Sequence, residues 1–178
     1  MSDSRALIPP LSDWLQVPRD LESALAGLTE DELSLRGGTD GWSIREHVHP
    51  LVESNVTACT IVIAALGTGG CTFDCSWLNS DPAWMERTKY NRVLVASALE
   101  VLAPLCRYAA ELLSAAPEAL RHEIKLVGAP GTEPYPMTVE QMIGLEVDHA
   151  QQHVQEIVDI LKQRPPTPLP ADHFTIAP

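Results

Sequence analysis

Two histidines four residues apart, His149 and His153, are the pair in this sequence best suited to hold a metal ion. On a helix this spacing puts the imidazoles about 40° apart around the axis and roughly 6 Å apart along it, so both can reach one ion. Neutral imidazole is a good ligand for zinc, nickel or iron. The pair is not the metalloprotease motif, because Ala150 follows His149 where that motif has a general-base glutamate.

The segment around the pair indicates that both imidazoles face a protein core. An apolar stripe accompanies them at helical spacing: Met142, Ile143, Ala150, Ile157, Ile160 and Leu161. Two imidazoles in such surroundings need polar partners. A shared metal ion supplies one for both, and the alternative is that each hydrogen-bonds a buried carbonyl or carboxylate. Glu146 lies close to the stripe and could orient an imidazole or join a metal shell.

A second pair, His47 and His49, belongs to another helical segment. His47 falls on the edge of its inward stripe, which runs through Ile44, Val48, Leu51, Asn55, Ala58 and Val62. His49 points about 200° away from His47, toward the opposite side of the helix. We therefore expect His47 to meet His149 and His153, and His49 to be exposed or at a subunit contact.

Capping signals mark the helices that must position these residues. Ser43 to Glu46 and Thr138 to Gln141 are capping boxes, and Thr29 to Glu32 is a third that begins a short helix. Asp81-Pro82 is typical of an N-cap followed by a first-turn proline. We expect main helices near 18–28, 44–66, 82–116 and 139–163, with a segment capped by Ser12 before the first. Four helices and one long excursion predict an all-α, antiparallel four-helix bundle.

The remaining segments suggest connections and arms. His122 to Val127 is either a short strand or a loop. Prolines cluster near both ends, at Pro9-Pro10 and between residues 165 and 170, which favours extended terminal arms. The 178 residues fit a single domain, with a core over about 18–164 and a C-terminal arm over 165–178.

Composition narrows the class of protein. Twelve basic against 24 acidic residues give a formal charge of −12, so we expect neither nucleic-acid nor membrane-surface binding. The longest strongly apolar stretch, Ala58 to Leu66, is too short to span a bilayer, and the N-terminus does not resemble a signal peptide. Four cysteines are too few for a disulfide framework, so we expect a cytoplasmic protein with reduced thiols. The C-x3-C pair Cys71 and Cys75 is a weak zinc motif.

Several of these segments together resemble the DinB/YfiT-like superfamily. The segment 41–53, GWSIREHVHPLVE, resembles the start of that family's second helix, and 148–157, DHAQQHVQEI, resembles its closing helix. The segment 21–35 and Tyr90-Asn91-Arg92 also match. The resemblance covers roughly residues 21–162, and the order and separation of the motifs are more specific than any one of them.

The resemblance implies an up-down-down-up four-helix bundle that is usually a homodimer. It also implies a divalent metal held by three histidines, one from the second helix and the H-x3-H pair, here His149 and His153. Relatives with known chemistry are thiol-dependent transferases that act on small electrophiles with bacillithiol, mycothiol or glutathione, or isomerise maleylpyruvate. In such chemistry the metal lowers the pKa of a bound thiol.

One position departs from the family pattern. The second-helix ligand of the family falls on Pro50, which cannot bind a metal and costs about 3 kcal/mol in a helix interior. His47 lies about 60° and roughly 4.5 Å from this position, and His49 about 100° away. Three outcomes remain open: a rearranged site of His47, His149 and His153, a weak site of two histidines, or no metal.

Two functions therefore remain open. The first is a metal-dependent enzyme, a thiol S-transferase or a hydrolase, with a small-molecule substrate and in the first case a low-molecular-weight thiol as cosubstrate. The second is a non-catalytic helical homodimer whose metal site is degenerate. A dimer would cover Val52, Val56, Ile61 and Ile63, which lie off the inward stripe of their helix.

Overall fold

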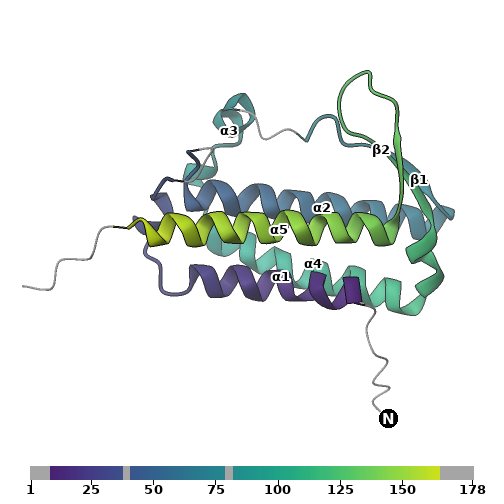
Figure 1. Cartoon of the computed structure of the whole chain (residues 1–178), viewed down its shortest axis with the longest axis horizontal. Helices are drawn as coiled ribbons and strands as arrows, with labels where there is room; N and C mark the ends of the chain where they lie inside the picture. Colours follow the sequence, from purple (N-terminus) through teal and green to yellow (C-terminus); the bar gives the residue numbers. More distant parts are fainter. Residues whose placement is uncertain (1–8, 38–40, 79–81, 165–178) are drawn as a thin grey trace, which may run out of the picture.

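A computed structural model describes residues 9–37, 41–78 and 82–164 and confirms the four-helix bundle (Figure 1). The four long helices are α1 (Pro9–Leu25), α2 (Ile44–Thr68), α4 (Val95–Ala115) and α5 (Val139–Lys162). Hydrogen bonds join Arg45 to the Val93 carbonyl at one end and His122 to the Ala65 carbonyl at the other, so α2 and α4 run in the same direction. In chain order, the long helices α1, α2, α4 and α5 therefore run up, down, down and up.

The capping boxes form as the sequence predicts. The Ser43 hydroxyl accepts from the Glu46 amide while the Glu46 carboxylate accepts from the Ser43 amide, and Thr138 and Gln141 make the same exchange at α5. Thr29 and Glu32 form a similar pair before a short 3-10 turn, η1 (Glu32–Ser34). These boxes satisfy amides that have no partner within the helix, and they fix where α2 and α5 begin.

Two predicted boundaries were wrong. The first helix begins at Pro9 rather than near residue 18, so Pro9-Pro10 belongs to its first turn, where a missing amide costs little, and not to an extended arm. Its inner face buries an apolar stripe that extends the helix past Pro18: Leu11, Trp14, Val17, Leu21 and Leu25. Burial of this whole stripe favours the longer helix over a break at the proline.

The predicted helix over 82–116 is divided in two. The short helix α3 (Pro82–Thr88) ends at Lys89, which has left-handed backbone angles (φ 57°), and the 3-10 turn η2 (Tyr90–Arg92) leads into α4. A non-glycine residue in this region costs about 1–2 kcal/mol. Buried Tyr90 holds the break in place, because its hydroxyl donates to the Glu53 carboxylate of α2 and accepts from the Trp84 indole.

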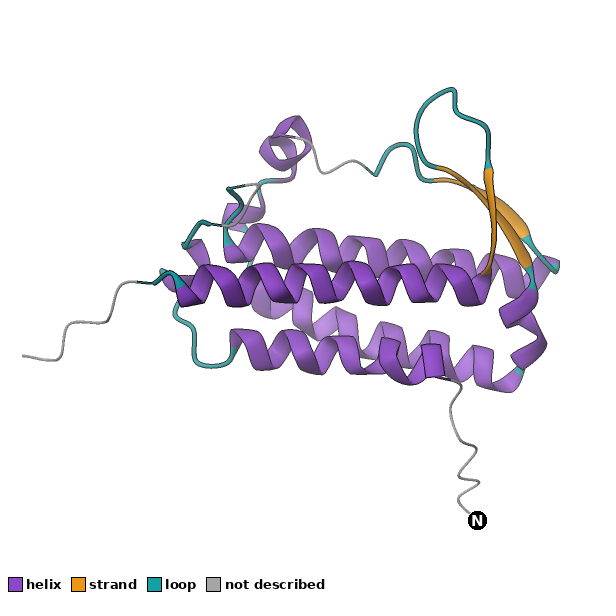
Figure 2. Cartoon of the chain, viewed as in Figure 1, coloured by secondary structure: helices purple, strands orange, loops and turns teal. Residues whose placement is uncertain are grey.

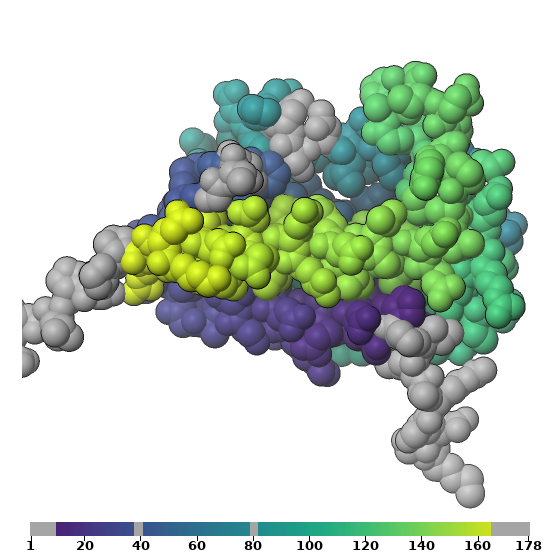
Figure 3. Space-filling view, viewed as in Figure 1, coloured from purple at the N-terminus to yellow at the C-terminus, as the bar shows by residue number. Residues whose placement is uncertain are grey.

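A small sheet closes one end of the bundle (Figure 2). Strand β1 (Cys71–Asp74) pairs in parallel with β2 (Glu123–Val127), and β2 pairs antiparallel with β3 (Tyr135–Thr138), which runs directly into α5. A further 3-10 turn, η3 (Pro117–Arg121), joins α4 to β2. The segment 122–127 is therefore largely strand. The space-filling view shows α5 crossing one face above α1, with the β2–β3 hairpin rising at one end (Figure 3).

Helix α2 packs against α4 and α5. It is long and apolar enough to cross a membrane by length and composition, but 56% of its most apolar window is buried inside the fold. Helices α3 and α4 together also pass that test, yet they bend by 104° at their junction. The high hydropathy of α2 is that of a core helix, because its apolar side chains are buried against the neighbouring helices. The predicted C-terminal arm and the Asp81 cap lie outside the described residues.

All four cysteines are free thiols. Cys71 and Cys75 lie four residues apart along an extended segment, which separates them by about 13 Å. That distance is too long for a disulfide or for chelation of one zinc ion. Burial raises the pKa of the Cys59 and Cys106 thiols to about 12, so neither is a thiolate at neutral pH.

Candidate metal centre

The start of α2 places one imidazole beside an indole. Trp42 immediately precedes the N-cap Ser43, and His47 is the fourth helical residue after it. Side chains at these two positions often meet in a hydrophobic staple, an apolar contact that accompanies the capping box. Here the rings of Trp42 and His47 lie 5.5 Å apart between centroids. The helix start therefore fixes where His47 projects into the bundle.

Three imidazoles form a row between α2 and α5. His47 Nδ1 lies 3.1 Å from His153 Nδ1, and His153 Nε2 lies 2.9 Å from His149 Nε2. His47 is buried and the other two are largely buried. The structure thus brings together the three histidines that the sequence singled out, with His153 in the middle. Whether they bind a metal stays a prediction.

The donor atoms fit a divalent ion in part. Nitrogen ligands at 2.0–2.1 Å from a metal are about 2.9 Å apart at an octahedral edge, which matches the two Nε2 atoms of His149 and His153. The nearest nitrogen of His47 faces the opposite side of the His153 ring. Within the described parts of the chain, no three ligating side chains already converge on one point. The helical pair is therefore ready for an ion, and His47 has to rotate to join it.

The surroundings keep these imidazoles neutral. Burial, with the neighbouring His149 and His47, lowers the pKa of His153 to about 3, and burial also lowers the pKa of His149. Loss of water disfavours the imidazolium form of both rings. Neutral imidazole is the form that binds metal ions, so the fold holds His149 and His153 in their ligating state at neutral pH.

A buried carboxyl lies one turn before the pair on α5. The Oε2 atom of Glu146 is inaccessible to solvent and has no hydrogen-bond partner among the described residues. Burial raises the pKa of this carboxyl, and the Ser54 hydroxyl offsets only part of the effect. A carboxyl with one unsatisfied oxygen on the histidine face suits the role of orienting an imidazole or reaching an ion.

His49 lies elsewhere, and one expectation about it was wrong. It is buried rather than exposed, and its ring stacks on Tyr90 with centroids 5.0 Å apart. Burial lowers the pKa of this histidine, although its hydrogen bond to Val93 acts in the opposite direction. The helix directs His47 and His49 to different sides, as their spacing predicts, and Tyr90 covers the side of His49.

Pro50, at the family's ligand position, is buried within an unbroken α2. The bundle core around the helix therefore outweighs the cost of a proline in its interior. Because Pro50 offers no donor atom, the only α2 imidazole in contact with the α5 pair among the described residues is that of His47.

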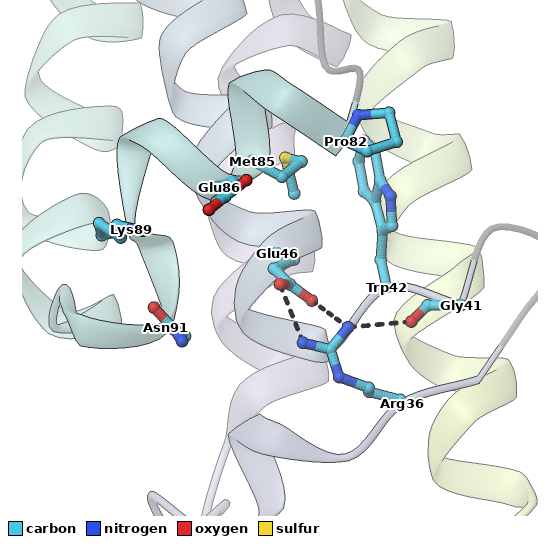
Figure 4. A pocket seen from close by; sticks show the side chains of 9 residues that line it. All are labelled: Arg36, Gly41, Trp42, Glu46, Pro82, Met85, Glu86, Lys89 and Asn91. Atoms are coloured by element: carbon cyan, nitrogen blue, oxygen red, sulfur yellow. Dashed lines mark hydrogen bonds and ion pairs between the residues drawn. The ribbon is translucent and has the colours of Figure 1, made fainter.

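A pocket of about 370 Å³ lies outside the histidine row and has Trp42 in its wall. Helix α3 and the start of α2 form its walls (Figure 4). Trp42 lines this pocket and also stacks on His153, with centroids 6.1 Å apart and planes inclined by 18°. The sequence did not predict this pocket, because it gave no signal for the break between α3 and α4.

The fold and the site define a four-helix bundle with an imidazole cluster between its second and last helices. The family model of the DinB superfamily matches residues 13–157, and the chain belongs to this superfamily. Its fold is similar to that of YfiT from Bacillus subtilis, with a TM-score of 0.72 and 20% identity over 91% of this chain and 89% of that one. YfiT is described as a probable metal-dependent hydrolase with an unusual four-helix bundle topology. No curated protein matches the sequence.

Proposed function

We propose that this protein is a metal-dependent enzyme that acts on a small molecule, with His149, His153 and His47 as ligands of a divalent zinc, nickel or iron ion. The observation that carries the proposal is the row of three imidazoles, one buried and two largely buried, next to a pocket. The DinB family membership and the description of YfiT add support. Burial of three imidazoles serves little structural purpose, since apolar side chains would fill the same space without polar groups.

The residues of this chain have distinct roles in the proposal. When bound, a divalent ion lowers the pKa of a coordinated thiol or water and so supplies a nucleophile at neutral pH. His149 and His153 would hold that ion, with Nε2 atoms already 2.9 Å apart, and His47 would complete the protein ligands. Trp42 shields the imidazoles from bulk solvent on the pocket side. Glu146 orients the neighbouring histidine or holds a proton close to it.

The reaction we favour is thiol S-transfer to an electrophile, with hydrolysis at the same site as the second form of the enzyme. A low-molecular-weight thiol is the cosubstrate in the first case and water the nucleophile in the second. Pro50 and the rotation required of His47 favour a different candidate, a non-catalytic bundle with a degenerate site. Metal analysis of the purified protein distinguishes the enzyme, which should retain a metal ion, from the non-catalytic bundle, which should not.

We also propose a homodimer. Two of the four residues expected at the interface, Val52 and Ile61, are buried inside the protomer and need no second subunit to cover them. Val56 and Ile63 remain 43% and 48% exposed on α2, and Val101 and Tyr108 are exposed on the neighbouring α4. Apolar side chains on two packed helices favour a symmetric contact. The four reduced thiols agree with a cytoplasmic location, which we propose as well.

The decisive experiment measures metal and turnover on the same protein. Untagged protein from cells grown with zinc, nickel, iron and manganese is analysed for bound metal by mass spectrometry. It is then assayed with bacillithiol, mycothiol or glutathione and a fluorogenic electrophile such as monochlorobimane. We expect about one metal per chain, lost in His149→Ala. If the wild type retains no first-row metal, the non-catalytic candidate replaces the enzyme.

A further inference from the structure

The pocket outside Trp42 has apolar walls and a polar rim (Figure 4). Trp42, Pro82 and Met85 supply the apolar surface. The rim carries charged and amide side chains: Arg36, Glu46, Glu86, Lys89 and Asn91. Because Trp42 also stacks on His153, a ligand held here lies against the indole that covers the histidine row.

The two positive and two negative side chains of the rim balance in charge, and they differ in how far they are engaged. Glu46 is fully engaged, because its carboxylate accepts from the Ser43 amide and hydroxyl and from both terminal nitrogens of Arg36. Glu86 is the other carboxylate, and its side chain has no hydrogen bond or ion pair within the described residues. Lys89 and Asn91 have no hydrogen bond or ion pair from their side chains within the described residues, and the Arg36 side chain is 57% exposed. The rim is therefore neutral in a chain of net charge −12.

Lys89 occupies a backbone position that glycine would take more easily. Its φ of 57° ends α3, and it is the only non-glycine residue with positive φ in the described chain. A left-handed residue at the end of a helix is usually glycine. A lysine that keeps this conformation at the rim of a pocket indicates a use for its ammonium group there.

We propose that this pocket binds the carboxylate of a small organic anion, with Lys89 and Asn91 as its donors and the apolar body of the anion against Trp42 and Met85. The inference rests on the proposed function, since it describes the substrate class of the same site. It adds the charge of the substrate and the residues that select for it. Lys89 supplies a charge opposite to that of the ligand, and the neutral rim repels an anion less than the rest of this acidic chain does.

The test uses three probes with the same aromatic body: phenylacetate, neutral 2-phenylethanol and cationic phenethylamine. Binding to wild-type protein is followed through the indole N–H signals of its four tryptophans in proton–nitrogen NMR spectra. The Trp42 signal is assigned with Trp42→Phe. We expect phenylacetate to shift the Trp42 signal and to bind at least fivefold more tightly than the other two probes.

Two variants of Lys89 separate a binding role from a structural one. Lys89→Gly should abolish the preference for phenylacetate and raise the melting temperature, because glycine suits a φ of 57°. Lys89→Gln should abolish the preference while keeping a side chain of similar length. The matched control is Lys125→Gln, which replaces an exposed lysine on β2 and should leave the preference for phenylacetate unchanged.

The outcomes distinguish this inference from the proposed function. Equal binding of the three probes, or an undiminished preference in Lys89→Gly, overturns the anion site. The titration is repeated on His149→Ala, where the preference should persist because the pocket residues are intact. If the wild-type protein binds no metal but prefers phenylacetate, the enzyme proposal fails and the anion site stands. If the wild-type protein binds metal but does not prefer phenylacetate, the anion site fails and the enzyme proposal stands.

Discussion

Trp42 lies over His153, with the indole and imidazole planes inclined by 18° and their centroids 6.1 Å apart. The indole belongs to the residue before α2, and the imidazole to the fourth turn of α5. One face of Trp42 thereby covers the centre of the histidine row, and the same side chain lines the outer pocket. Trp42 is therefore shared by the candidate metal centre and the outer pocket.

Removal of single histidines should rank them as ligands. His153→Ala should abolish metal binding, since His153 contacts both other imidazoles. His47→Ala should weaken binding about tenfold or more, at least as much as loss of a residue that only orients a ligand. His49→Ala should have little effect, because its ring faces Tyr90. Competition with a chelating dye measures each affinity, and a larger loss in His49→Ala than in His47→Ala would contradict this assignment.

Acid should destabilise the metal-free protein through the buried imidazoles. The unfolded chain takes up a proton on His153 near pH 6.5, whereas the folded protein does so only near pH 3. The stability contribution is therefore complete above pH 6.5 and falls between these values by up to about 1.4 kcal/mol per pH unit for this group. Urea unfolding of chelator-treated protein at pH 8 and pH 5 checks the slope, which should be shallower in His153→Leu.

Glu146 should give the opposite pH dependence. Its pKa in the folded protein lies above the usual 4.5, so the folded state favours the proton and stability declines as pH rises through that range. Glu146→Gln keeps the shape without the charge. We expect chelator-treated Glu146→Gln to be more stable than wild type at pH 8, with the difference vanishing near pH 4. A variant less stable at every pH would show that the carboxylate is paired in the folded state.

A buried hydrogen bond between α1 and α2 offers a test of the core. The Trp14 indole donates to the Asn55 side-chain oxygen at 2.7 Å, and both residues are buried. Asn55→Ala leaves that indole without an acceptor and should cost about 1–3 kcal/mol of unfolding free energy. The matched control is Gln16→Ala on the exposed side of α1, which should change it by less than about 0.5 kcal/mol. Urea denaturation measures both.

The proposed dimer is tested by charge on the exposed face of α2. Val56→Glu and Ile63→Glu place carboxylates where apolar side chains are 43% and 48% exposed. We expect light scattering to give twice 19.4 kDa for the wild type and the monomer mass for the double variant, with unchanged helical circular dichroism. A wild-type mass near 19.4 kDa at micromolar concentration would rule out a stable dimer.

The sequence alone determined the bundle and the approximate position of its histidines. Local interactions fix helix starts, so Ser43 and Thr138 predicted the beginnings of α2 and α5 to the residue. Helical spacing then separated His47 from His49 and put His149 beside His153. These features depend only on residues within a few positions of one another.

Only the tertiary structure decided the features that join distant segments. The break at Lys89 depends on the contact of Tyr90 with Glu53, which lies 37 residues earlier, and it creates the pocket wall. The first helix extends to Pro9 because its stripe packs against α5 and α4. His153 meets His47 across 106 residues, and the order of the imidazoles in the row follows from how α2 packs against α5. Such contacts depend on packing between helices, which no local pattern specifies.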